Sequence, residues 1–108
     1  MGIKIILACA VGMSTSMLME QMKKAAKAVA LEVEIAAFPV SKLNAEAPES
    51  SIILLGPQVS YMKEKIASAF PTIPVQVIDM RDYGMMNGEK VLQDALDVLN
   101  KAKSTNAP

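Results

Sequence analysis

The single cysteine of this 108-residue chain stands directly before a segment rich in small and hydroxyl-bearing residues. Cys9 follows the apolar run at residues 3–8, and the next seven residues read AVGMSTS. In a loop that leaves a strand and enters a helix, successive backbone N–H groups form a concavity for an anion, and the helix dipole adds partial positive charge. The same potential favours the nucleophilic thiolate. The pattern therefore predicts a thiolate in a phosphate-sized cradle, a device for making a phosphocysteine.

The residues after the cysteine supply the turn and the hydrogen-bond donors of the predicted loop. Gly12 lets the backbone turn without a Cβ clash, and three consecutive hydroxyl residues add hydrogen-bond donors. The predicted phosphate-binding residues are Ala10, Val11, Gly12, Met13, Ser14, Thr15 and Ser16. A lone cysteine at the end of a buried strand is also a common small core residue, and that alternative stays open here.

The nearest comparable chemistry is the loop of the cysteine phosphatases, Cys-x5-Arg-Ser/Thr. In this chain Thr15 stands at the arginine position, and Ser16 takes the hydroxyl position that follows. The arginine grips phosphate with two hydrogen bonds and stabilises the transition state. Without it the loop favours a carrier over fast hydrolysis. The alternative is a low-molecular-weight cysteine phosphatase or an arsenate reductase, although a second cysteine for the disulfide-forming kind is missing.

Composition excludes several other classes of function. The chain has 11 basic and 11 acidic side chains, so it has no basic field for nucleic acid or an anionic membrane. The absence of histidine excludes Ser-His and Cys-His dyads, histidine-ligated metal and phosphohistidine in the chain itself. One cysteine excludes an internal disulfide and a CxxC pair and fits a reducing compartment. No apolar run approaches the roughly 18 residues needed to span a bilayer, and we expect a cytoplasmic protein.

Alternating strand and helix patterns predict the elements that position the cysteine. We expect strands at residues 3–8, 33–38, 51–55 and 74–78. A helix follows the cysteine loop, with Ser14, Thr15 or Ser16 as its cap, and its apolar stripe runs from Leu18 to Val29. A short helix at 41–48, a helix from Pro57 that ends before Pro71, a loop at 79–88 and a last helix capped by Asn87 complete the chain.

This alternation predicts an α/β fold with a single open, four-stranded parallel sheet in the order 2-1-3-4 and helices on both faces. We expect one domain over residues 1–103 and a flexible tail at 104–108. Ligands bind such a sheet at the carboxyl ends of the strands, where the strand order reverses. Here the reversal lies between the first and third strands, which brings Cys9 and the turn at residues 56–58 together. Gln58 can hydrogen-bond the loop there or remain a solvated first-turn residue.

The loop after the fourth strand holds further candidates. Tyr83 is a better candidate than Tyr61 for a supporting residue on a partner-binding face. Asp79 is expected to cap the loop, because a carboxylate beside a phosphoryl group would repel it. Arg81, the only arginine, is expected to pair with Asp79 or Asp82 rather than with phosphate.

Three segments in series carry a specific resemblance. Residues 9–18 (CAVGMSTSML), 54–62 (LLGPQVSYM) and 77–84 (VIDMRDYG) occur in the order seen in one family. Together they resemble the IIB component of the lactose/cellobiose (chitobiose) family of the bacterial phosphoenolpyruvate-dependent sugar phosphotransferase system. The likeness runs from about residue 3 to about residue 102.

The resemblance implies a phosphotransferase mechanism and its partners. A phosphohistidine on a IIA protein would phosphorylate Cys9, and the phosphocysteine would pass the group to a sugar held by the membrane partner IIC. The implied sugar is a β-linked disaccharide, no cofactor or metal is implied, and the simplest oligomeric state is a monomer. A flavodoxin-like mononucleotide-binding module is a further alternative, although the chain has no tryptophan and few aromatic residues to sandwich a flavin.

Overall fold

Four parallel strands form one open sheet in the computed structural model, which describes residues 3–10 and 13–106. The strands lie in the order β2-β1-β3-β4, which confirms the predicted order 2-1-3-4. Every neighbouring pair in the sheet is parallel. Their bounds are Ile3–Cys9 for β1, Val33–Pro39 for β2, Ile52–Leu55 for β3 and Val75–Val77 for β4.

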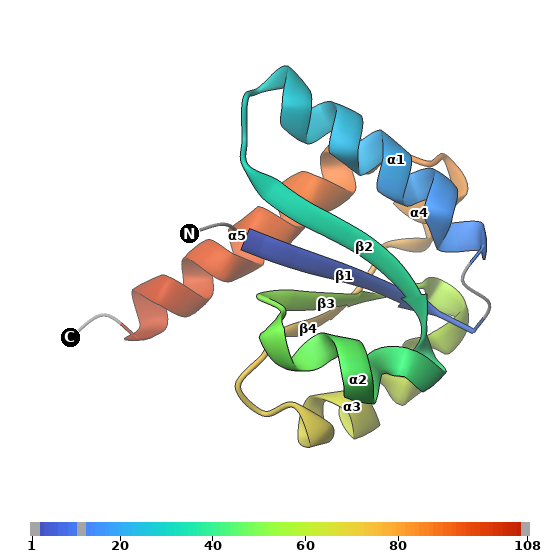
Figure 1. Cartoon of the computed structure of the whole chain (residues 1–108), viewed down its shortest axis with the longest axis vertical. Coiled ribbons are helices and arrows are strands. Elements are labelled where there is room, and N and C mark those ends of the chain that lie inside the picture. The colour runs from blue at the N-terminus through green and yellow to red at the C-terminus, as the bar shows by residue number, and fades with distance from the viewer. Residues whose placement is uncertain (1–2, 11–12, 107–108) are drawn as a thin grey trace.

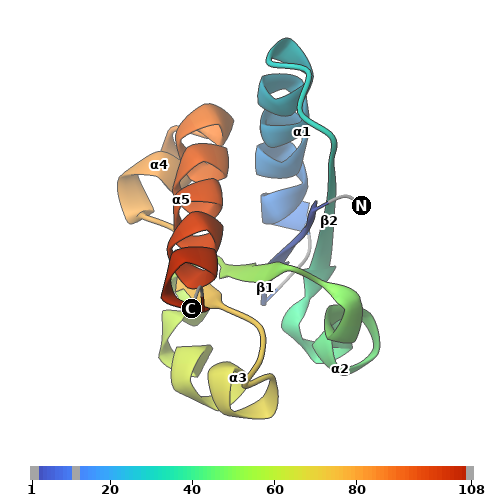
Figure 2. The ribbon, with the colours of Figure 1, turned by 90° about the vertical axis from the view of Figure 1, so that its left-hand side faces the viewer.

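Helices cover both faces of this sheet, as predicted (Figures 1 and 2). One face carries α1 (Met13–Ala28), α4 (Met80–Gly84) and α5 (Gly88–Asn106). The other face carries α2 (Leu43–Glu46) between the 3-10 turns η1 (Val40–Lys42) and η2 (Ala47–Glu49). It also carries η3 (Pro57–Met62), which leads into α3 (Lys63–Ala69).

The central strands supply apolar side chains to two cores, one on each face. In β1, Ile5 and Leu7 pack with α1 and α5, whereas Ile6 and Ala8 pack with α2 and α3. The four residues of β3 alternate in the same way between the two cores, with Ile52 and Leu54 on the side of α1 and α5 and the other two on the side of α2 and α3. Successive side chains of a strand point to opposite faces, so a continuous apolar run is what a sheet covered on both sides requires.

Several element boundaries differ from the sequence-based prediction. The segment 79–88, expected to be a loop, contains the helix α4, and α5 continues through residues 104–106, where we expected the tail. Val29, expected on the apolar stripe of the first helix, lies beyond the end of α1 and is exposed. Asn87 does cap α5, since its Oδ1 accepts a hydrogen bond of 3.2 Å from the Lys90 N–H.

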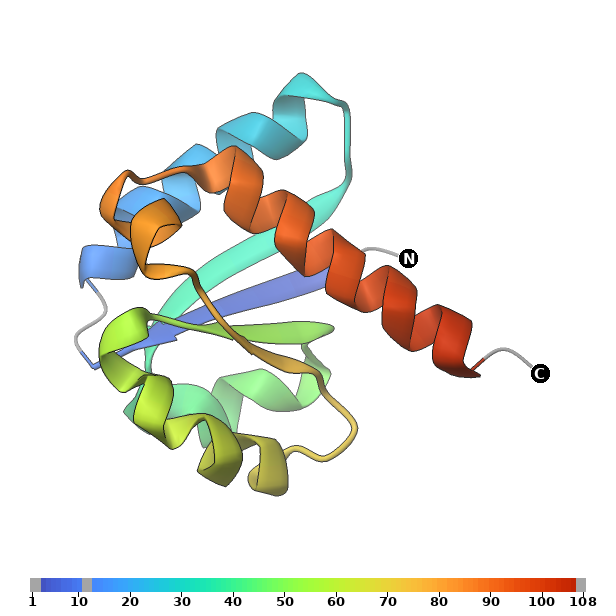
Figure 3. The ribbon, with the colours of Figure 1, turned by 180° about the vertical axis from the view of Figure 1, so that it is seen from behind.

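A glycine sets how closely α1 and α5 pack, and Figure 3 shows the two helices crossing over the sheet. A Cβ atom added at Gly88 would lie only 2.5 Å from the backbone carbon of Gln21 and from the backbone nitrogen of Met22. Real Cβ atoms do not approach backbone this closely. The start of α5 therefore rests directly on the backbone of α1, the helix that follows the cysteine.

Candidate phosphate-binding site

Cys9 is the last residue of β1 and lies at the carboxyl edge of the sheet. Its side chain is buried, with only 2% of its surface exposed, and it is in register with Pro39 of β2. Ala10 follows as an exposed bend. Val11 and Gly12 lie outside the described residues, so their predicted roles in the loop stay predictions.

The helix after the loop begins earlier than the sequence predicted. Residues 13–16 have helical backbone and form the first turn of α1. Ser14, Thr15 and Ser16 are therefore inside the helix rather than at its cap, because the helix starts at Met13. This placement brings the first turn of a 16-residue helix to the edge where Cys9 lies. The dipole of such a helix favours negative charge at this end.

The turn after β3 closes around Cys9, as the topology predicted. The N–H of Gly56 donates a hydrogen bond of 2.8 Å to the carbonyl oxygen of Ala8, which ties the end of β3 to the end of β1. A Cβ atom built on Gly56 would lie 3.4 Å from the Cβ of Cys9 and 3.1 Å from Oε1 of Gln58. The Gln58 amide and the Cys9 side chain thus both lie close to the same point beside Gly56. The Gly-Pro pair predicted a turn here, but no local signal predicted this close approach.

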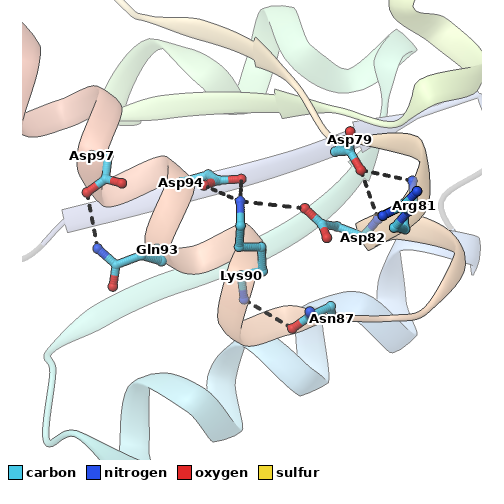
Figure 4. Close-up of polar contacts among 8 residues, drawn as sticks. All are labelled: Asp79, Arg81, Asp82, Asn87, Lys90, Gln93, Asp94 and Asp97. Atoms are coloured by element: carbon cyan, nitrogen blue, oxygen red, sulfur yellow. Dashed lines mark hydrogen bonds and ion pairs between the residues drawn. The ribbon is translucent and has the colours of Figure 1, made fainter.

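Asp79 has the capping role that the sequence predicted, whereas Arg81 lacks the ion pair that we expected (Figure 4). Its Oδ2 accepts hydrogen bonds from the N–H groups of Arg81 at 3.0 Å and Asp82 at 3.2 Å, which caps α4. The predicted ion pair of Arg81 with either aspartate is wrong. Within residues 3–10 and 13–106, the Arg81 guanidinium makes no ion pair, because Asp79 is used as a cap and Asp82 faces Lys90.

Lys90 of α5 links that helix to Asp82 of α4 at this corner of the molecule. Its Nζ lies 2.8 Å from Asp94 Oδ1 and 4.0 Å from Asp82 Oδ2. The hydrogen bond that Lys90 donates to the Asp94 carboxylate, together with the negative charges of Asp94 and Asp82, raises the pKa of Lys90. An open depression of about 490 Å³ lies over this group. Its mixed charges leave no strong field for an anion.

Tyr83 is not on a partner-binding face, and that prediction is wrong. Its side chain is buried in the core between α1 and α5, because the helix α4 turns it inward. Tyr61 instead is 80% exposed, on η3 at the same edge as Cys9. In the part of the chain that the structure describes, no group of three or more acidic or cysteine side chains lies close enough to hold a metal ion. No helix among those residues is long and apolar enough to cross a membrane.

Comparison with solved structures defines the class of protein. The chain superposes with a TM-score of 0.77 on a lactose-specific IIB component domain of the phosphoenolpyruvate:carbohydrate phosphotransferase system from Streptococcus pneumoniae. That match covers 90% of this chain and 97% of the other at 19% identity, so it shows the fold. The solution structure of a cellobiose-specific phosphotransferase IIB component from Borrelia burgdorferi gives a TM-score of 0.79. Here the identity is 37%, over 94% of each chain.

Sequence comparison names the family within that class. Residues 4–94 match the family described as "PTS system, Lactose/Cellobiose specific IIB subunit". Two relatives from Lactococcus lactis, a galactose-specific and a cellobiose-specific EIIB component, are each 42% identical. An oligo-beta-mannoside-specific EIIB component from Bacillus subtilis is 39% identical. All three matches cover 89% of this chain and 95% of the relative.

The chain therefore belongs to the lactose/cellobiose-specific IIB family of the sugar phosphotransferase system. Components of this kind are phosphotransferases in sugar transport and work with IIA and IIC partners. The phosphatase and flavodoxin-like alternatives are not favoured. The resemblance that the three sequence segments carried is confirmed.

Proposed function

We propose that Cys9 carries the phosphoryl group between a phosphohistidine on a IIA partner and a sugar bound by the membrane partner IIC. The observation that carries this proposal is the position of Cys9. It ends β1 at the carboxyl edge of the sheet, beside the first turn of α1 and the turn at Gly56. In open α/β sheets this edge, where the strand order reverses, is where ligands bind.

The transfer consists of two displacements at phosphorus. In the first, the Cys9 thiolate attacks the phosphorus, an S–P bond forms, the P–N bond to the donor histidine breaks, and the imidazole leaves with the electron pair. In the second, a sugar hydroxyl oxygen attacks the same phosphorus, the S–P bond breaks, and the hydroxyl proton passes to a base on the partner. Such transfers depend on positioning and charge stabilisation, which backbone donors can supply.

The chain's own groups would hold the phosphoryl oxygens. The first N–H groups of a helix have no carbonyl of their own turn to bind, and Met13, Ser14 and Thr15 occupy these positions in α1. We propose that residues 10–16 form the cradle and that the Gln58 amide, next to Cys9, supports it. No carboxylate is needed in this arrangement, and Asp79 is already engaged by two backbone N–H groups.

We propose a β-linked disaccharide as the sugar. Relatives at 39–42% identity are named for cellobiose, galactose and oligo-beta-mannoside, so similar IIB chains serve different sugars. We therefore assign the choice of sugar to the membrane partner.

The test is the intact mass of the protein after incubation with a phosphorylated IIA protein. Wild type should gain one phosphoryl group, and Cys9→Ser should gain none in the same incubation time, because a serine hydroxyl is a much weaker nucleophile than a cysteine thiolate. Circular dichroism of Cys9→Ser provides the control for folding. Uptake by Cys9→Ser at the wild-type rate would show that the acceptor is another residue.

A further inference from the structure

The large apolar side chains that remain exposed are unevenly distributed over the surface. Among the side chains that the structure describes, five large apolar ones are largely exposed. They are Met17 at 65%, Val29 at 70%, Tyr61 at 80%, Met80 at 74% and Met85 at 70%. Four of these five belong to elements that follow the carboxyl end of a strand; we call Met17, Tyr61, Met80 and Met85 the apolar rim.

The connectivity places the apolar rim around the edge that holds Cys9. Met17 lies in α1, which follows β1, and Tyr61 lies in η3, which follows β3. Met80 and Met85 begin and follow α4, the helix after β4. In a parallel sheet these three exits share one edge, and Figures 1 and 3 show the starts of α1 and α4 at the same end of the molecule. Val29 follows α1 and precedes β2, at the opposite edge.

The burial of Cys9 limits how a donor can reach it. With 2% of its surface exposed, the side chain is recessed behind the surrounding residues. A phosphohistidine extends only one side chain beyond the surface of the protein that carries it, so that surface must come into contact with the residues around Cys9. The elements that surround this edge are those that carry the apolar rim.

The composition of the apolar rim suits a transient protein contact. Methionine is flexible and polarisable and adapts to different surfaces, and tyrosine is enriched at the centres of protein interfaces. The chain has no net charge, and the polar group at this corner combines Asp79, Asp82 and Asp94 with Lys90 and Arg81. Attraction between net charges therefore contributes little to the affinity for a partner, and burial of apolar surface makes the larger contribution.

We infer that the apolar rim is the surface on which the phosphohistidine-bearing IIA partner docks, and that it supplies the main part of the affinity between the two proteins. This inference rests on the proposed function, since it concerns the donor to Cys9. It assigns binding of the donor to Met17, Tyr61, Met80 and Met85, and chemistry to the cysteine loop.

The test compares a rim variant with a control at the opposite edge. The rim variant combines Met17→Gln, Tyr61→Gln and Met80→Gln, which retain long side chains and remove apolar surface at exposed positions. The control is Val29→Thr, a change of the same kind at an exposed site away from Cys9. For each protein, the rate of phosphocysteine formation is measured against the concentration of phosphorylated IIA, and circular dichroism verifies the fold.

The rim variant should show an apparent KM for the donor raised about tenfold or more. Its kcat should stay within about twofold and its final phosphate content should equal that of wild type, because the loop is unchanged. Val29→Thr should match wild type. An unchanged KM in the rim variant, or a loss confined to transfer from phosphocysteine to sugar, would overturn the inference and leave the function of Cys9 intact. A wild-type protein that accepts no phosphate would instead overturn the proposed function and this inference with it.

Discussion

The hydroxyl of Tyr83 is buried and has no hydrogen-bond partner among the residues that the structure describes. A buried polar group in this state costs free energy, whereas the ring that carries it packs in the core beside α1 and α5. Tyr83→Phe keeps the ring and removes the hydroxyl. We expect the free energy of unfolding to rise by about 1 kcal/mol, measured by urea denaturation.

The matched control is Tyr61→Phe, because that tyrosine is exposed. Its unfolding midpoint should not change. A loss of stability in Tyr83→Phe would mean that the hydroxyl donates a hydrogen bond in solution that this structure does not contain.

At the scale of elements, the start of α5 rests on the middle of α1, the helix that follows Cys9. Gly88→Ala would place a methyl group 2.5 Å from the α1 backbone at Gln21 and Met22. The two helices would have to separate, since backbone atoms cannot move aside as a side chain can. We expect a loss of about 3 kcal/mol in the free energy of unfolding, at the upper end of the usual cost of overpacking.

Gly84→Ala provides the control for this experiment. A Cβ atom on Gly84 would meet no atom within 4 Å, and the residue lies in the helix α4. Alanine favours a helix more than glycine does, so stability should be equal or slightly higher. Equal urea midpoints for Gly88→Ala and wild type would show that the two helices are not packed this closely in solution.

At the scale of the whole molecule, one sheet connects the two cores. Strands β1 and β3 supply side chains to both faces, so neither core can lose its packing without disturbing strands that the other needs. We expect a single cooperative unfolding transition, as is usual for a domain of this size. Far-UV circular dichroism and tyrosine fluorescence should give the same urea midpoint.

The fluorescence is best measured in a Tyr61→Phe background. The chain contains two tyrosines and no tryptophan, so Tyr83 alone would then report on the core of α1 and α5. Two separate midpoints would mean that the α1–α5 core unfolds independently of the rest of the sheet.

The sequence by itself determined the features that depend on neighbouring residues and on patterning. Alternating apolar runs and helical stripes predicted the strand order, and local cap chemistry predicted the roles of Asp79 and Asn87. Because the carboxyl ends of parallel strands share one edge, the same pattern predicted that Cys9 and Gln58 lie together. The element types follow from the backbone periods of helix and strand, and the shared edge follows from the general topology of parallel sheets.

Only the tertiary structure decided the features that depend on contacts between distant segments. The burial of Tyr83, the lack of an ion pair at Arg81 and the seating of Gly88 on α1 each depend on where another element lies. The same holds for the exposure of Met17 and Met80, because an apolar side chain is buried only where a neighbouring element covers it. A local pattern shows what a residue can do, and long-range packing determines which of these possibilities the folded chain uses.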